Sequence, residues 1–119
     1  MLTAICHCGA VRMTIPRRPR SVTGCNCSIR RRYGVLWGYY KASEVQVTAA
    51  DGAQHQYRCA DNVLRFSRCG HCGCVTHWEH LHPTDASRMG VNMRHFDPAA
   101  LGPMRIRLLD GADTWKYVG

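Results

Sequence analysis

Short runs of alternating apolar and polar residues dominate the chain, and turn-forming residues break them at close intervals. The first two runs meet at Gly9. The loop after them contains Pro16 and Pro19, which cannot serve a central strand. Many short strands at close spacing predict a mainly β fold with little helix. The predicted strands are 2–7, 10–15, 35–40, 45–49, 54–59, 62–68, 73–78, 89–93 and 104–109.

Only two segments favour helix. Residues 28–33 predict one helical turn with Ser28 as its N-cap, and residues 98–101 predict a turn or a short helical segment. Asp51-Gly52 and Asp110-Gly111 supply further turns. A chain of 119 residues has room for one domain, which we assign to residues 1–119.

Composition narrows the class of protein. A hydrophobic fraction of 45% and a charged fraction of 20% are typical of a globular protein and exclude a disordered or collagen-like chain. No apolar run reaches the length of a membrane span. Residues 1–6 contain neither the basic nor the apolar region of a signal peptide. We therefore expect a cytoplasmic protein with no membrane partner.

Eight cysteines in a reducing compartment favour metal ligands or reactive thiols over disulfides. Cys69 and Cys72 lie three residues apart, so a tight turn can aim both sulfurs at one ion, and Gly73 lets the backbone curl beneath them. Cys6 and Cys8 are the natural partner pair. Together the two pairs predict a four-cysteine zinc site that closes a loop of about sixty residues. The alternative interpretation is that these cysteines are small buried apolar residues.

The second cysteine pair, Cys25 and Cys27, completes a pattern that resembles the glutathione-dependent formaldehyde-activating enzyme family, which shares its domain with centromere protein V. The resemblance covers nearly the whole chain. It implies a β-tent (Mss-four-like) fold of short antiparallel sheets around a structural zinc on the first Cys-x-Cys and the Cys-x-x-Cys, in agreement with the pairing above. The matching segments are 6–12, 25–28, 31–34, Cys69 with Cys72, 90–92 with Asp97, and 110–115.

The resemblance also implies a second metal, held by a C-x-C-x-x-C triplet and tied to activity. Three thiolates leave a fourth zinc position open for a substrate sulfur. The implied activity is that of a carbon–sulfur lyase acting on a thiol-carried aldehyde such as S-hydroxymethylglutathione. This chain departs from the triplet, because its third position is Arg30, which stays protonated and cannot ligate a metal. Cys25, Cys27 and Arg30 are nevertheless the candidate catalytic residues.

Three hypotheses stay open for this altered site. Cys59, Cys74 or a histidine such as His77 could join Cys25 and Cys27 in a rearranged second zinc site. Arg30 could instead lower the thiol pKa of the pair and make it reactive without metal. In the third hypothesis the site is inactive, and the chain is a non-catalytic zinc module that binds an acidic partner or nucleic acid.

The positive net charge of the chain is relevant to these hypotheses but does not decide among them. The formal net charge is +8, and fourteen of the sixteen cationic residues are arginines, which favour bidentate recognition of carboxylate or phosphate. The run Arg30–Arg32 could hold the carboxylates of a glutathione conjugate, contact nucleic-acid phosphates, or form a solvated basic face. We expect Arg17, Arg18 and Arg20 to be exposed loop residues. The net positive charge alone does not imply that the protein binds nucleic acid.

Overall fold

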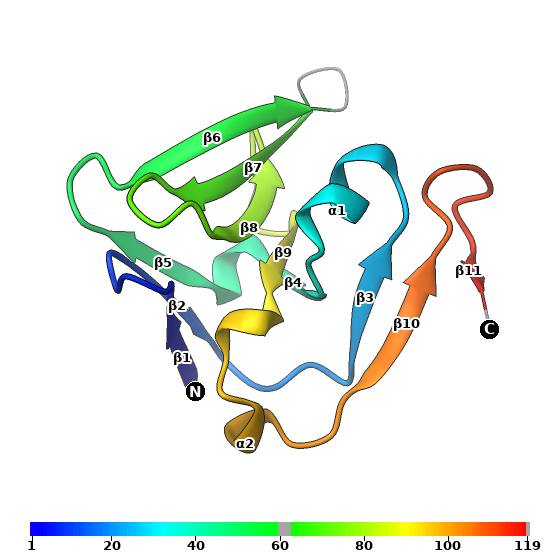
Figure 1. Ribbon diagram of the computed structural model, residues 1–119, viewed down its shortest axis with the longest axis horizontal. Coiled ribbons are helices and arrows are strands. Elements are labelled where there is room, and N and C mark those ends of the chain that lie inside the picture. The colour runs from blue at the N-terminus through cyan, green and yellow to red at the C-terminus, as the bar shows by residue number, and fades with distance from the viewer. Residues whose placement is uncertain (60–62, 119) are drawn as a thin grey trace.

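The computed structural model describes residues 1–59 and 63–118, and in these residues the chain is mainly β, as predicted (Figure 1). A three-stranded sheet has the order β1-β2-β5, and an eight-stranded sheet has the order β11-β10-β3-β4-β9-β8-β7-β6. The strands are β1 (Leu2–Ile5), β2 (Val11–Ile15), β3 (Ser21–Cys25), β4 (Trp37–Lys41), β5 (Gln46–Ala49), β6 (Gln54–Cys59), β7 (Leu64–Cys69), β8 (Val75–His80), β9 (Arg88–Asn92), β10 (Arg105–Leu109) and β11 (Tyr117–Val118).

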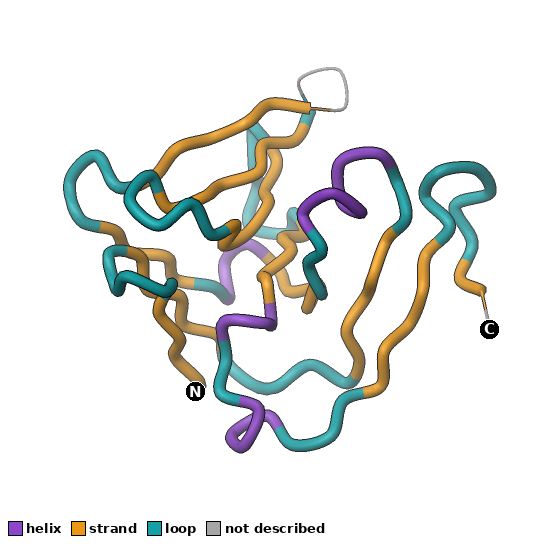
Figure 2. Tube along the Cα trace, viewed as in Figure 1, coloured by secondary structure: helices purple, strands orange, loops and turns teal. Residues whose placement is uncertain are grey.

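Helix is confined to short segments between strands, as Figure 2 shows. They are α1 (Ser28–Tyr33), α2 (Pro98–Leu101) and two 3-10 turns, η1 (Ala42–Glu44) and η2 (Met93–His95). The N-cap of α1 is Cys27 and not Ser28, so that prediction is wrong by one residue. No helix in the described part of the chain has the length and apolar character needed to cross a membrane.

The two sheets and α1 enclose a core on both faces of the central strand β4, because successive side chains of a strand point to opposite faces. Tyr40 packs with residues of the small sheet such as Met13 and Ile15. Trp37 packs on the other side with Phe66 and Trp78, against which α1 also lies. The candidate thiol site lies beside this second cluster.

Two strands of the structure, β3 and β11, were not predicted from the sequence. β3 contains few apolar residues, and it is held by parallel pairing with β10, whose Leu109 lies opposite Cys25. β11 has only two residues and pairs with the end of β10. Such pairing partners are distant in sequence, so local alternation cannot reveal them. Position 62, where one predicted strand begins, lies outside the described residues.

Some predicted strands have different bounds in the structure, because turns that contain cysteines lie at their ends. The strand predicted over 2–7 ends at Ile5, and the strand predicted over 10–15 begins at Val11, because residues 6–10 form a turn. In this turn the Cys6 N–H donates to the Val11 carbonyl over 3.0 Å, and Gly9 has φ +84°, which favours glycine. The strand predicted over 73–78 is shifted to Val75–His80 by the turn that precedes it.

The close approach of Gly90 to the Trp78 indole gives the first prediction. A Cβ at position 90 would overlap this ring, so Gly90→Ala should lower the free energy of unfolding by about 1–3 kcal/mol. Chemical denaturation measures the loss. Gly24→Ala is the matched control, because its Cβ would meet Leu108 and Leu36 at ordinary distances of 3.5 and 3.6 Å. Equal destabilisation by the two variants would contradict this packing.

Candidate metal centre and thiol site

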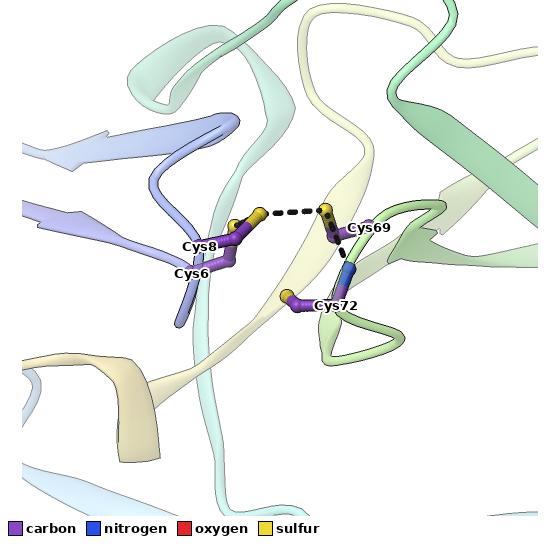
Figure 3. A group of neighbouring side chains, drawn as sticks. All are labelled: Cys6, Cys8, Cys69 and Cys72. Carbon is purple, nitrogen blue, oxygen red and sulfur yellow. Dashed lines mark hydrogen bonds between the residues drawn. The ribbon is translucent and has the colours of Figure 1, made fainter.

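Four cysteine sulfurs converge between two turns. Cys6 and Cys8 follow β1, and Cys69 and Cys72 lie at the turn from β7 to β8, so that the two pairs face each other (Figure 3). All four sulfurs lie within 4.8 Å of one another. The Cys6–Cys8 and Cys8–Cys69 sulfur distances are 3.7 and 3.5 Å. Tetrahedral zinc with bonds of about 2.3 Å needs sulfurs about 3.8 Å apart, so this group can hold such an ion.

Backbone N–H groups stabilise negative charge on these sulfurs. The Val11 N–H donates to the Cys6 sulfur over 3.4 Å, and those of His71 and Cys72 donate to the Cys69 sulfur over 3.4 and 3.5 Å. Gly73, with φ +79°, closes the second turn. Hydrogen bonds of this kind favour the thiolate form that binds metal and hold each ligand in position.

Ionisation of one thiol in this cluster affects the ionisation of its neighbours. Burial opposes ionisation of Cys72, but hydrogen bonds from the backbone of Cys74 and Cys8 and from the Cys69 and Cys74 thiols together outweigh it and lower the pKa of Cys72 to about 5. The Ala10 N–H favours a Cys8 thiolate, yet the neighbouring Cys69 sulfur and burial raise the pKa of Cys8 to about 11. Four adjacent thiolates repel one another, and a divalent cation removes this penalty. The cluster therefore has the chemistry of a closed structural metal site.

The second cysteine pair lies elsewhere, between β3 and α1. Cys25 ends β3 and is buried, and Cys27 precedes the first turn of α1. Arg30, in that turn, points its guanidinium at Cys27, and its Nη1 donates to the Cys27 sulfur over 3.6 Å. These three residues are the candidate catalytic group predicted from the sequence, and in the structure Arg30 contacts Cys27 directly.

An aromatic pocket fixes the Arg30 head group. Its guanidinium carbon lies 5.6 Å from the centre of the Phe66 ring and 5.8 Å from that of Trp78, within the range of cation–π attraction. Its Nε is buried and has no hydrogen-bond partner among the described residues. Arg30 thus brings a permanent positive charge into a largely apolar environment beside a thiol.

The C-terminal segment completes the surroundings of the pair. Asn26 clamps it from the middle of the Cys-x-Cys: its Nδ2 donates to an Asp110 carboxylate oxygen over 3.0 Å, and its Oδ1 accepts from the Ala112 N–H over 3.0 Å. A Cβ at Gly111 would lie 2.5 Å from the Cys25 sulfur, so only glycine fits there. The family resemblance pointed to segment 110–115, but nothing in the sequence predicted these contacts.

A cavity of about 390 Å³ opens in front of Cys27. Its walls are Cys27, Ser28, Ile29, Arg30, Cys59, Leu64, Phe66, Gly111, Ala112 and Trp115. A space of this size holds a small organic ligand, with Cys27, Cys59 and Arg30 as its reactive or charged groups.

Arg30 also changes the ionisation of Cys27. Burial raises the pKa of this thiol, but the Arg30 N–H and the Arg30 charge outweigh burial, and the pKa of Cys27 is lowered from its usual value. A lowered thiol pKa increases the thiolate fraction near neutral pH, and the thiolate is the nucleophilic form.

The residues present do not fit a second metal. In residues 1–59 and 63–118 the Cys6, Cys8, Cys69, Cys72 group is the one cluster of three or more metal-ligating side chains. Cys59 shares the cavity of Cys27 without completing a ligand set, and Cys74 lines a different cavity with His7 and His95. His77 is buried, with its Nδ1 2.9 Å from the Thr76 hydroxyl. A guanidinium beside Cys27 would also repel a cation.

Comparison with known proteins gives the family of the chain and a similar fold. The family model of the glutathione-dependent formaldehyde-activating enzyme matches residues 1–106, and the chain belongs to this family. A crystal structure of a Rhodobacter sphaeroides protein has a similar fold, with a TM-score of 0.71 and 24% identity over 88% of this chain and 99% of that chain. A comparison with curated proteins finds no significant match.

The four-sulfur geometry predicts the effect of removing one ligand. Cys69→Ala should abolish metal binding and lower the melting temperature by about 10 °C or more, because metal binding and folding are coupled. Metal analysis and calorimetry measure the two effects. Cys74→Ala is the control, since Cys74 lies outside the group and should leave metal content unchanged. An unchanged melting temperature in Cys69→Ala would show that the four sulfurs share no ion.

The contact between Arg30 and Cys27 predicts an unusually reactive thiol. Cys27 should be alkylated by iodoacetamide with a midpoint below the ordinary thiol pKa, and Arg30→Gln should move the midpoint upward by about 1 unit, since the positive charge is lost. Peptide mass spectrometry across a pH series gives the rate at this residue. Equal midpoints in the two proteins would contradict this role of Arg30.

Proposed function

We propose that this protein is a carbon–sulfur lyase that acts on a thiol-carried aldehyde, with S-hydroxymethylglutathione as the model substrate, at a site that works without a second metal. The four-cysteine centre binds zinc and has a structural role, since four thiolates in a closed arrangement are typical of structural zinc. Cys27 and Arg30 carry the reaction. Free thiols and zinc thiolates suit the reducing cytoplasm.

The observation that supports this proposal most is the hydrogen bond from Arg30 to Cys27 at the wall of a ligand-sized cavity. In the cleavage direction the Cys27 thiolate accepts the hydroxyl proton of the substrate. The carbon–oxygen double bond forms as the carbon–sulfur bond breaks, and the electron pair of that bond leaves with the substrate sulfur. The products are the aldehyde and a free thiolate, and Cys27 is left protonated.

Arg30 stabilises the negative sulfur both before and after the carbon–sulfur bond breaks. Before reaction its guanidinium stabilises the Cys27 thiolate. Once Cys27 is protonated, the same donors can stabilise the departing thiolate, so the positive charge stays opposite one negative sulfur throughout. Cys25 is buried behind Cys27, and its role is to pack the loop against Gly111.

The neighbouring arginines provide a matched test. Exchange of formaldehyde between its free and glutathione-bound pools can be followed by NMR. Arg30→Gln should slow the catalysed exchange about 100-fold, because removing one donor to a developing anion has an effect of this size. Arg31→Gln removes an equal charge from an exposed position of α1 and should change the rate less than about threefold. Equal losses, or no catalysis by the unaltered protein, would refute the proposal.

Restoring the family triplet tests the metal-free character of the site separately. Arg30→Cys should bind one additional zinc ion per chain, because it supplies a third thiolate beside Cys25 and Cys27. Metal analysis of the purified variant measures this gain. Unchanged metal content would mean that the altered site has been placed wrongly.

A further inference from the structure

A cationic groove is separate from the cavity of Cys27, although its wall residue Tyr39 packs against Trp78, which also contacts Arg30. It consists of two adjoining hollows, of about 530 and 380 Å³, which share Arg17, Tyr39 and Tyr40. The first hollow lies against the loop that leads into β3, and the second extends to η1 and the start of β9. The groove has no wall residue in common with the cavity of Cys27.

The groove exists because two neighbouring strands diverge. Within the described residues, β3 and β4 are in register at one pair, Thr23 and Trp37. Beyond it, the loop before β3 and the end of β4 separate. The loop is still held in place, since the Tyr40 hydroxyl donates to the Arg17 carbonyl over 2.8 Å. The three arginines of this loop, Arg17, Arg18 and Arg20, are exposed as expected, and all of them line the first hollow.

The charge in the groove is strongly unbalanced. Glu44 is its one acidic wall residue, and it already pairs with Arg17 at 2.7 Å. In the described part of the chain no carboxylate lies within ion-pair distance of the other cationic wall residues. An anionic ligand would relieve the repulsion among them. The cationic wall residues are Arg17, Arg18, Arg20, Lys41 and Arg88.

Three of these cations are already held by the protein, and one of them is Arg18, whose Nη2 donates to the Pro103 carbonyl over 2.7 Å. Arg88 lies over the Tyr39 ring at 5.0 Å, and Arg17 lies over the Tyr40 ring at 5.9 Å. Because guanidinium groups cover these rings, the groove offers charge and hydrogen-bond donors more than a platform for stacking nucleobases. Arginine forks match the oxygens of phosphate in a bidentate way.

We propose that this groove binds a compact ligand with two or more adjacent phosphate groups. The two hollows have the volume of a small-ligand site. Four of the five cations are arginines, and they line both hollows, so adjacent phosphates can be bound together. This inference is independent of the proposed lyase activity.

Inorganic triphosphate is the probe, and calorimetric titration at low and at physiological salt measures its affinity. Arg20→Gln combined with Arg88→Gln should weaken binding about tenfold or more, because two unpaired cations leave the groove. Arg58→Gln combined with Arg105→Gln is the matched control. It removes the same charge from exposed positions of β6 and β10 and should change affinity less than about threefold.

Three results would overturn the proposal. The first is the absence of triphosphate binding at millimolar concentration. The second is an equal loss in the control pair, which would show that net charge alone attracts the ligand. The third is binding about tenfold tighter to an oligoglutamate peptide or to oligothymidylate than to triphosphate, which would assign the groove to an acidic peptide or to single-stranded nucleic acid.

Discussion

The convergence of four cysteine sulfurs is the constraint on which the rest of this structure depends. Cys8 and Cys69 are separated by 61 positions in sequence, and their sulfurs lie 3.5 Å apart. The apolar cluster here is small, because two of its four buried members are the ligands Cys6 and Cys69 and the other two are Val11 and Ala53, so hydrophobic burial alone contributes little at this junction. A metal ion bound there would join the turn after β1 to the turn before β8. Because β8 carries Trp78, the same junction fixes one wall of the pocket that holds Arg30.

In the proposed function, Arg30 stands where the family resemblance implies a metal-ligating cysteine, and it brings a positive charge of its own. A guanidinium has one charge and no open coordination position, so it can stabilise a thiolate without binding a substrate sulfur as a Lewis acid would. The Phe66 and Trp78 rings compensate for its partial burial, and the lowered pKa of Cys27 is the chemical consequence. An arginine at this position is thus compatible with thiol chemistry, and it requires a mechanism in which charge stabilisation replaces coordination.

The sequence could predict what local patterns encode. Alternation located most strands, and the spacing of the cysteines with their trailing glycines indicated the four-sulfur group. It could not predict β3, whose pairing with β10 joins residues 84 positions apart, such as Ser21 and Arg105. It also missed the clamp of Asn26 on Asp110 and the assembly of the basic groove around Tyr39 and Tyr40. Each depends on segments that meet only after the sheets have formed, and no local periodicity reports such contacts.

We infer that one metal centre and one metal-free arginine–thiol site coexist in this chain. Metal content per chain should therefore be measured together with a count of reactive thiols in the native protein. We expect one zinc ion per chain and three accessible thiols, Cys27, Cys59 and Cys74, because Cys25 is buried. Two zinc ions per chain, with Cys27 protected from alkylation, would contradict this expectation, because a second ion would then occupy the position that Arg30 holds.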